Sequence, residues 1–109
     1  MNSITNPFNL PERPQKRVFD NSIVEDGNES EVLDLSAYPI NTISVFGCLE
    51  TTGCITLKLS DDNITFETTD YKQEAQGCFG FSTEKITSKF ARLLYNGDVN
   101  NVYAFIVTY

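Results

Sequence analysis

The sequence contains no histidine and no tryptophan among its 109 residues. Histidine is the usual general base of enzymes and the commonest side-chain ligand of transition metals. Its absence excludes Ser-His and Cys-His nucleophilic pairs, and the chain has no glycine-rich loop that could hold a phosphate. We therefore expect a protein that is not an enzyme and that uses no cofactor.

Long apolar runs are missing as well. No stretch approaches the ~20 apolar residues that a membrane-spanning helix requires. The N-terminus also lacks the basic-then-apolar layout of a secretory signal. We therefore expect neither membrane association nor export. The sequons Asn28-Glu29-Ser30 and Asn63-Ile64-Thr65 are interpreted as chance matches in loop-forming sequence.

Cysteine is scarce, and its count of three is odd. Cys48 and Cys54 flank the stretch LETTG, so they could face each other across a hairpin and leave Cys78 unpaired. In a chain without an export signal, this pattern favours free thiols over a disulfide framework.

Basic residues are few, and they are unevenly placed. Residues 1–17 carry three basic and one acidic side chain, whereas residues 18–109 carry five basic and fourteen acidic ones. An acidic body repels phosphate backbones, so the sequence argues against nucleic-acid binding by the folded part.

The first seventeen residues contain three of the four prolines and show no hydrophobic periodicity. Proline removes a backbone donor and pushes the preceding residue toward extended geometry. Residues 1–17 are therefore predicted to form an extended arm, which is either a solvated tail or a segment that binds a partner. The candidate partner-binding residues of this arm are Ile4, Pro7, Phe8, Leu10, Pro11, Arg13, Pro14, Lys16 and Arg17.

From Val18 onward, short alternating segments follow one another between turn-forming stretches. The clearest strand is CITLKLS, in which apolar residues at 55, 57 and 59 alternate with polar ones. ETTG is interpreted as a turn, YKQEAQG as a loop, TEKITSKF as at most a short helical turn, and Asn96-Gly97 as a hairpin. About eight strands at this spacing predict an antiparallel two-sheet β-sandwich, jelly-roll-like, over residues 18–109.

The last strand, VYAFIVTY, is apolar on both faces. One face carries Val102, Ala104 and Ile106, and the other carries Tyr103, Phe105, Val107 and Tyr109. The strand is therefore either covered on both sides or in contact with another subunit. In the second case, Tyr103, Phe105 and Tyr109 form the oligomer face.

Acidic and amide side chains gather where the clearest strand ends. Asp61, Asp62 and Asn63, with Glu67 or Asp70, could offer oxygen ligands to calcium, but the spacing does not match a helix-flanked calcium loop. Asp and Asn also stabilise hairpin tips by accepting backbone hydrogen bonds. The hairpin interpretation is favoured. The pairs Asp61/Asp62 and Glu67/Asp70 lie in or beside predicted turns, which disfavours a glycosidase.

The stretch SVFGCLETTGCITLKLSDDNITFETT resembles small β-sandwich proteins of phage virions and the sugar-binding sandwiches of the discoidin kind. The resemblance covers residues 40–109 and includes KFARLLYNGD as the penultimate strand. The residues that carry it are Ile55, Leu57, Ser60, Asp61, Asp62, Asn63, Phe66, Phe90, Arg92 and Leu94.

With its acidic body and proline-containing arm, the chain is similar to phage capsid decoration (cement) proteins. This resemblance implies a structural virion protein that is assembled in the host cytoplasm, binds the capsid or other virion proteins, and forms a homo-oligomer, with a trimer favoured. The alternative is a carbohydrate-binding module of a tail or fibre, in which Tyr71, Lys72 and Arg92 would contact the glycan.

Overall fold

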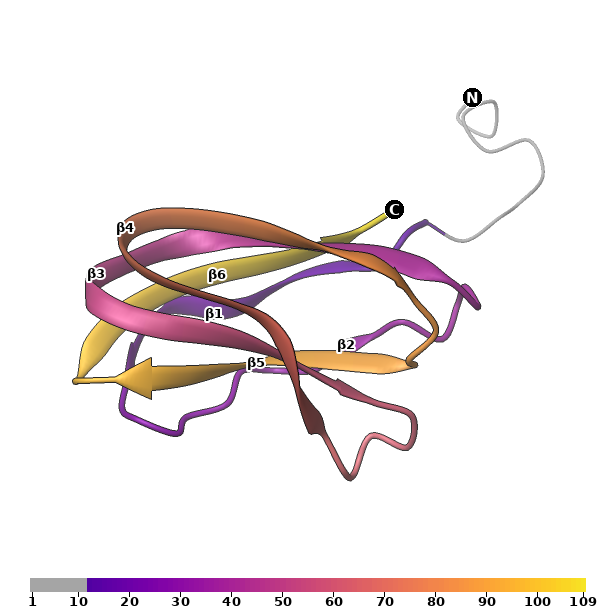
Figure 1. Cartoon of the computed structure of the whole chain (residues 1–109), viewed down its shortest axis with the longest axis horizontal. Helices are drawn as coiled ribbons and strands as arrows, with labels where there is room; N and C mark the ends of the chain where they lie inside the picture. Colours follow the sequence, from indigo (N-terminus) through magenta and orange to yellow (C-terminus); the bar gives the residue numbers. More distant parts are fainter. Residues whose placement is uncertain (1–11) are drawn as a thin grey trace.

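The computed structural model describes residues 12–109, which form strands and no helix (Figure 1). The expected all-β class is confirmed. No helix able to cross a membrane occurs in this part of the chain. The strands are β1 (Gln15–Val24), β2 (Leu33–Asp34), β3 (Asn41–Ser60), β4 (Glu67–Ile86), β5 (Phe90–Gly97) and β6 (Asn100–Thr108).

All of these strands belong to one antiparallel sheet with the order β1-β6-β3-β5-β2, and β4 pairs with the other edge of β3. A single edge of β3 serves two neighbours, since residues 43–49 pair with β6 and residues 53–60 pair with β5. Figure 1 shows the long β3–β4 ribbon turning over at one end, with β6 and β1 beside one half and β5 beside the other. The sheet therefore curls nearly into a barrel.

The described chain has six strands instead of the expected eight or so, because β3 and β4 are 20 residues each. The stretch ETTG does not end a strand. It lies at a register shift between Leu49 and Gly53, a bulge through which β3 continues. The predicted loop YKQEAQG is part of β4. It is polar because β4 is an exposed edge strand, and polarity alone does not separate an edge strand from a loop. The predicted helical turn is absent from the described residues.

The bend of β3 is fixed by a buried polar corner. Asn100 accepts a hydrogen bond from Thr51 N at 2.9 Å and donates through Nδ2 to Thr51 O at 2.7 Å. Its Nδ2 also donates to the hydroxyl of Tyr95 at 3.2 Å, and this hydroxyl donates to Asp98 O. The first residue of β6 is thus tied to the bulge of β3.

Two glycines make room for the Tyr95 ring, which is fully buried. A Cβ at Gly53 would lie 2.5 Å from the ring, and one at Gly97 would lie 2.6 Å from its hydroxyl. Gly97 also has a positive φ of 143°, and its N–H donates to Asp26 Oδ1 at 2.9 Å. The turn after Asn96 is not the tight hairpin that the sequence predicts. The strands on either side of it, β5 and β6, each pair with β3 and not with each other.

The core follows the period-two alternation of the strands. In β6, Val102, Ala104 and Ile106 are fully buried, as predicted, and the alternate residues are half-buried. Ile55 and Leu57 of β3 are also fully buried, and side chains from the other strands complete a single cluster. The interior of the curled sheet is therefore one apolar core.

The cysteines contradict the expectation of free thiols. Cys48 and Cys78 lie directly opposite each other on β3 and β4 and form a disulfide, whereas Cys54 is free. The predicted neighbours Cys48 and Cys54 do not face each other because both belong to β3, which continues through the stretch between them instead of turning back. The pairing of strands far apart in sequence decides which cysteines meet.

Candidate functional site

The acidic turn between β3 and β4 is closed by its own side chains. Asp62 Oδ1 accepts hydrogen bonds from Ile64 N at 2.8 Å and Thr65 N at 2.9 Å, and from Ser60 Oγ at 2.9 Å. The first two bonds, led by that of Thr65, lower the pKa of Asp62 below its usual range. Asn63 takes a positive φ of 62°. These are the contacts of a hairpin tip.

The calcium alternative finds no further support in this turn. Asp61, Asp62 and Glu67 line a shallow depression of about 390 Å³ together with serine and threonine hydroxyls. However, no group of three or more acidic, cysteine or histidine side chains within residues 12–109 is arranged to hold a metal. Asp70 does not line the depression.

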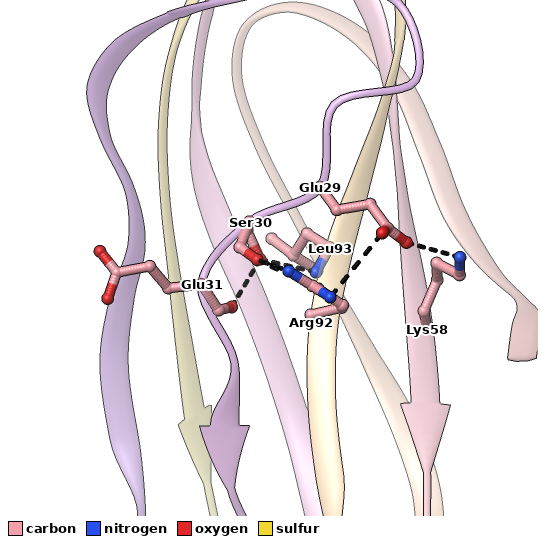
Figure 2. Close-up of polar contacts among 6 residues, drawn as sticks. All are labelled: Glu29, Ser30, Glu31, Lys58, Arg92 and Leu93. Atoms are coloured by element: carbon pink, nitrogen blue, oxygen red, sulfur yellow. Dashed lines mark hydrogen bonds and ion pairs between the residues drawn. The ribbon is translucent and has the colours of Figure 1, made fainter. Parts of the chain in front are cut away.

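A second polar cluster lies on the outer face of β3 and β5 (Figure 2). Lys58 and Arg92 are directly opposite each other in the strand register, so two like charges meet there. Glu29 bridges them, with Oε2 2.6 Å from Lys58 Nζ and Oε1 3.7 Å from Arg92 Nη1. The hydrogen bond from Lys58 lowers the pKa of Glu29, and the charges of both cations act in the same direction.

The same cluster attaches the loop between β1 and β2 to the sheet. Arg92 donates to Ser30 O through Nε at 3.1 Å and Nη2 at 2.7 Å. Ser30 Oγ, which is buried, accepts from Leu93 N at 2.8 Å. Glu29 forms an isolated bridge with Leu94. Figure 2 shows these groups pointing toward one another across the loop and β5, so their contacts are structural.

The proposed glycan contacts are not gathered into one site. Arg92 of β5 is engaged by the loop contacts just described, while Tyr71 and Lys72 belong to β4, on the far side of β3. The hydroxyl of Tyr71 accepts a hydrogen bond from Glu84 N at 3.3 Å, which joins two distant parts of β4. Of these three side chains only Lys72 is exposed, while Tyr71 and Arg92 are half-buried.

Part of the predicted arm is integrated into the fold. β1 begins at Gln15, before the expected domain boundary at residue 18. Lys16 pairs with Glu31 at 3.0 Å, and Arg17 pairs with Asp20 at 3.1 Å.

The residues just before β1 also contact the body of the protein. Arg13 donates to Ile40 O at 3.1 Å and to Asn41 Oδ1 at 3.2 Å. Pro14 O accepts from Thr108 Oγ1 at 2.7 Å. The other candidate arm residues lie outside the described part of the chain: Ile4, Pro7, Phe8, Leu10 and Pro11.

An aromatic patch marks the outer face of β3 and β6. We call Phe46, Tyr103 and Phe105 the aromatic face. Phe46 and Phe105 lie opposite each other in the register, and their rings stack at a centroid distance of 5.5 Å. Phe46 is 41% exposed, while the other two members are half-buried. The guanidinium of Arg17 lies 5.3 Å from the Tyr103 ring.

Of the predicted oligomer face, Tyr103 and Phe105 belong to this patch, and Tyr109 at the end of the chain is 64% exposed. Phe46 is not among the residues predicted for the oligomer face. The signal was present in the sequence, because strict alternation from Ile43 and Val45 directs residue 46 outward.

Comparison of the chain with protein-family models, with curated proteins and with solved structures gave no match.

Proposed function

We propose that the chain is a non-enzymatic structural protein of a virion, of the phage capsid decoration type, which binds neighbouring virion proteins through residues 1–11 and the aromatic face. In this proposal the curled sheet is a variant of the jelly-roll-like sandwich, the protein is assembled in the host cytoplasm, and the complex contains several copies, a trimer being favoured. No nucleic acid, membrane or cofactor takes part.

The observation that carries the proposal is the exposed aromatic face. Phe46 keeps 41% of its surface exposed although it lies beside a well-formed apolar core. Phenylalanine and tyrosine contribute large apolar area at little entropic cost, so they are enriched where proteins bind each other. By contrast, structural contacts occupy Asp62 of the acidic turn and the charged residues Glu29, Lys58 and Arg92 of the second cluster.

The leading segment offers apolar side chains that a partner could bury. β1 pairs with β6 from Gln15, which lies opposite Val107, and Arg17 lies opposite Phe105, so the chain enters the fold beside the aromatic face. Ile4, Phe8 and Leu10 could each contribute about 1.5–3 kcal/mol if a partner buries them. Ordering the segment opposes this gain, because each fixed residue loses backbone entropy. The prolines reduce that cost because they are already restricted in the free chain.

Co-sedimentation with purified capsid shells that lack this protein tests the proposal. The full chain should bind in a saturable manner, and a variant without residues 1–11 and the variant Phe46→Ser should each bind at least about tenfold more weakly. Ile64→Ser is the matched control, because Ile64 is apolar and 83% exposed but lies on the acidic turn, away from the aromatic face. Equal binding by all four proteins, or no binding by the full chain, would refute the proposal.

A further inference from the structure

The described sheet has one long edge without a strand partner. On the β1–β2 side the sheet nearly closes, because Glu31 N donates to Val18 O at 3.3 Å and Lys16 Nζ donates to Val32 O at 3.3 Å. On the opposite side, β4 pairs with β3 alone among the residues that the structure describes. The outer edge of β4 is therefore the open edge of the sheet.

The strand register identifies which backbone groups of β4 point outward. Thr42 exchanges two backbone hydrogen bonds with Tyr109, at 3.2 and 2.9 Å, so Thr42 faces β6. Because backbone direction alternates along a strand, residues 44, 46 and 48 of β3 also face β6 and not β4. Their partners on β4 are residues 82, 80 and 78, whose N–H and C=O groups must then point to the open edge.

This part of the edge lacks the usual protection against pairing. Natural edges carry charges, prolines or bulges. From Gly77 to Ser82, β4 has no charged residue and no proline, and its register with β3 is uninterrupted. Cys78, Gly80 and Ser82 are exposed, and the Cys48–Cys78 disulfide ties this edge to β3.

The sequence here also has the symmetry that pairing with an identical strand requires. In CFGFS, Phe79 and Phe81 flank Gly80, and the small residues Cys78 and Ser82 flank the phenylalanines. A two-fold axis through Gly80 would place Phe79 opposite Phe81 of the second copy. It would likewise place Cys78 opposite Ser82 of the second copy, so that small residues face each other. Two copies that each carry a net charge of −7 repel each other. Because residues 77–82 carry no charge, pairing through them adds no direct contact between like charges to this repulsion.

We propose that two copies of the free chain pair antiparallel through β4, on a two-fold axis at Gly80, a contact separate from the threefold association proposed for the virion. Gly80 then faces Gly80 of the second copy, and Cys78 faces Ser82, so that all three outward-facing residues form hydrogen-bonded pairs with about six backbone hydrogen bonds in total. The sheet continues from one copy into the other. Residues 1–11 are a poorer occupant of this edge because Pro7 and Pro11 cannot donate to a ladder.

Opposite charges placed at the axis provide the test. A Cβ at Gly80 would meet only Phe46 Cβ and Val45 O, both at 3.8 Å, so the fold accommodates a side chain there. Gly80→Asp and Gly80→Lys each set two like charges face to face, and each should weaken dimerisation by about tenfold or more in sedimentation equilibrium. An equimolar mixture of the two variants should form a heterodimer. Thr68→Asp and Thr68→Lys, exposed changes in the other half of β4, are the matched controls.

Hydrogen exchange provides the second measurement. In the wild-type dimer the amides of Cys78, Gly80 and Ser82 should exchange at least about tenfold more slowly than in the Gly80→Asp monomer, while those of Phe79 and Phe81, which face β3, change little. Circular dichroism verifies that the variants are folded. A wild-type protein that stays monomeric, or a dimer that both Gly80 variants leave intact, would overturn the inference.

Discussion

Replacing Asn100 by leucine should destabilise the fold at the corner where β3 bends. The side chain is 3% exposed and makes three hydrogen bonds, two with the backbone of Thr51 and one with the hydroxyl of Tyr95. Leucine has a similar size and leaves no large cavity, but it removes all three bonds. The substitution therefore isolates the polar contribution of this residue.

The expected magnitude follows from these contacts. A hydrogen bond contributes about 1 kcal/mol net, and a buried group left without a partner costs about 1–3 kcal/mol. Tyr95 is fully buried, but Thr51 is exposed, so water can partly replace the bonds that Thr51 loses. We expect a loss of about 2–4 kcal/mol in the free energy of unfolding, from a total that is about 5–15 kcal/mol for a typical domain.

Urea unfolding followed by circular dichroism measures this loss. The adjacent residue supplies a matched control, because the buried Oδ1 of Asn101 has no hydrogen-bond partner among the described residues. Asn101→Leu should therefore leave the free energy of unfolding unchanged within about 0.5 kcal/mol, or raise it. If Asn100→Leu cost no more than Asn101→Leu, the corner would not hold the bend and the reasoning would be refuted.

Other consequences of the structure can be measured in the same way. The pKa of Glu29 is lower in the folded state than its ordinary value of 4.5, so its contribution to stability is present above that pH and is lost as the pH falls through the folded-state pKa. Glu29→Gln should lower the unfolding free energy by about 1 kcal/mol near neutral pH, and the difference from wild type should shrink in acid; a constant difference would contradict this. Gly53→Ala should cost about 1–3 kcal/mol, because the added Cβ lies 2.5 Å from the ring of Tyr95, whereas Gly80→Ala, with its nearest contacts at 3.8 Å, should cost little. In peptide mapping without reductant, an alkylating reagent should modify Cys54 alone, and three reactive thiols in the native protein would contradict the pairing. Reduction of the disulfide, which spans 30 residues, should lower the free energy of unfolding by about 3–4 kcal/mol.

Local chemistry predicted several features that the structure contains. The alternation around Ile55 and Leu57 correctly indicated a buried face. The acidic turn was correctly interpreted as a hairpin tip, because Asp62 needs only neighbours within three residues to satisfy its carboxylate. Such features depend on contacts between residues close in sequence.

The predictions that were wrong concern features that depend on contacts between residues far apart in sequence. The stretch ETTG was read as a turn because it contains turn formers, but Asn100, 49 residues away from Thr51, holds it as a bulge within β3. The Asn96-Gly97 turn was read as a hairpin, but β5 and β6 each find a better partner in β3. Of the candidate interaction surfaces, the sequence indicated Tyr103 and Phe105, but it did not place Phe46 beside them.

The order of residues by itself determined the all-β class, the inward side of the clearest strand and the closure of the acidic turn, because these follow from steric and hydrogen-bonding preferences within a few residues. Only the tertiary structure decided which strands are neighbours, which cysteines join and which edge stays open. Those outcomes depend on which distant segments pack together in the one core. A short stretch of sequence does not contain the residues that make these long-range contacts.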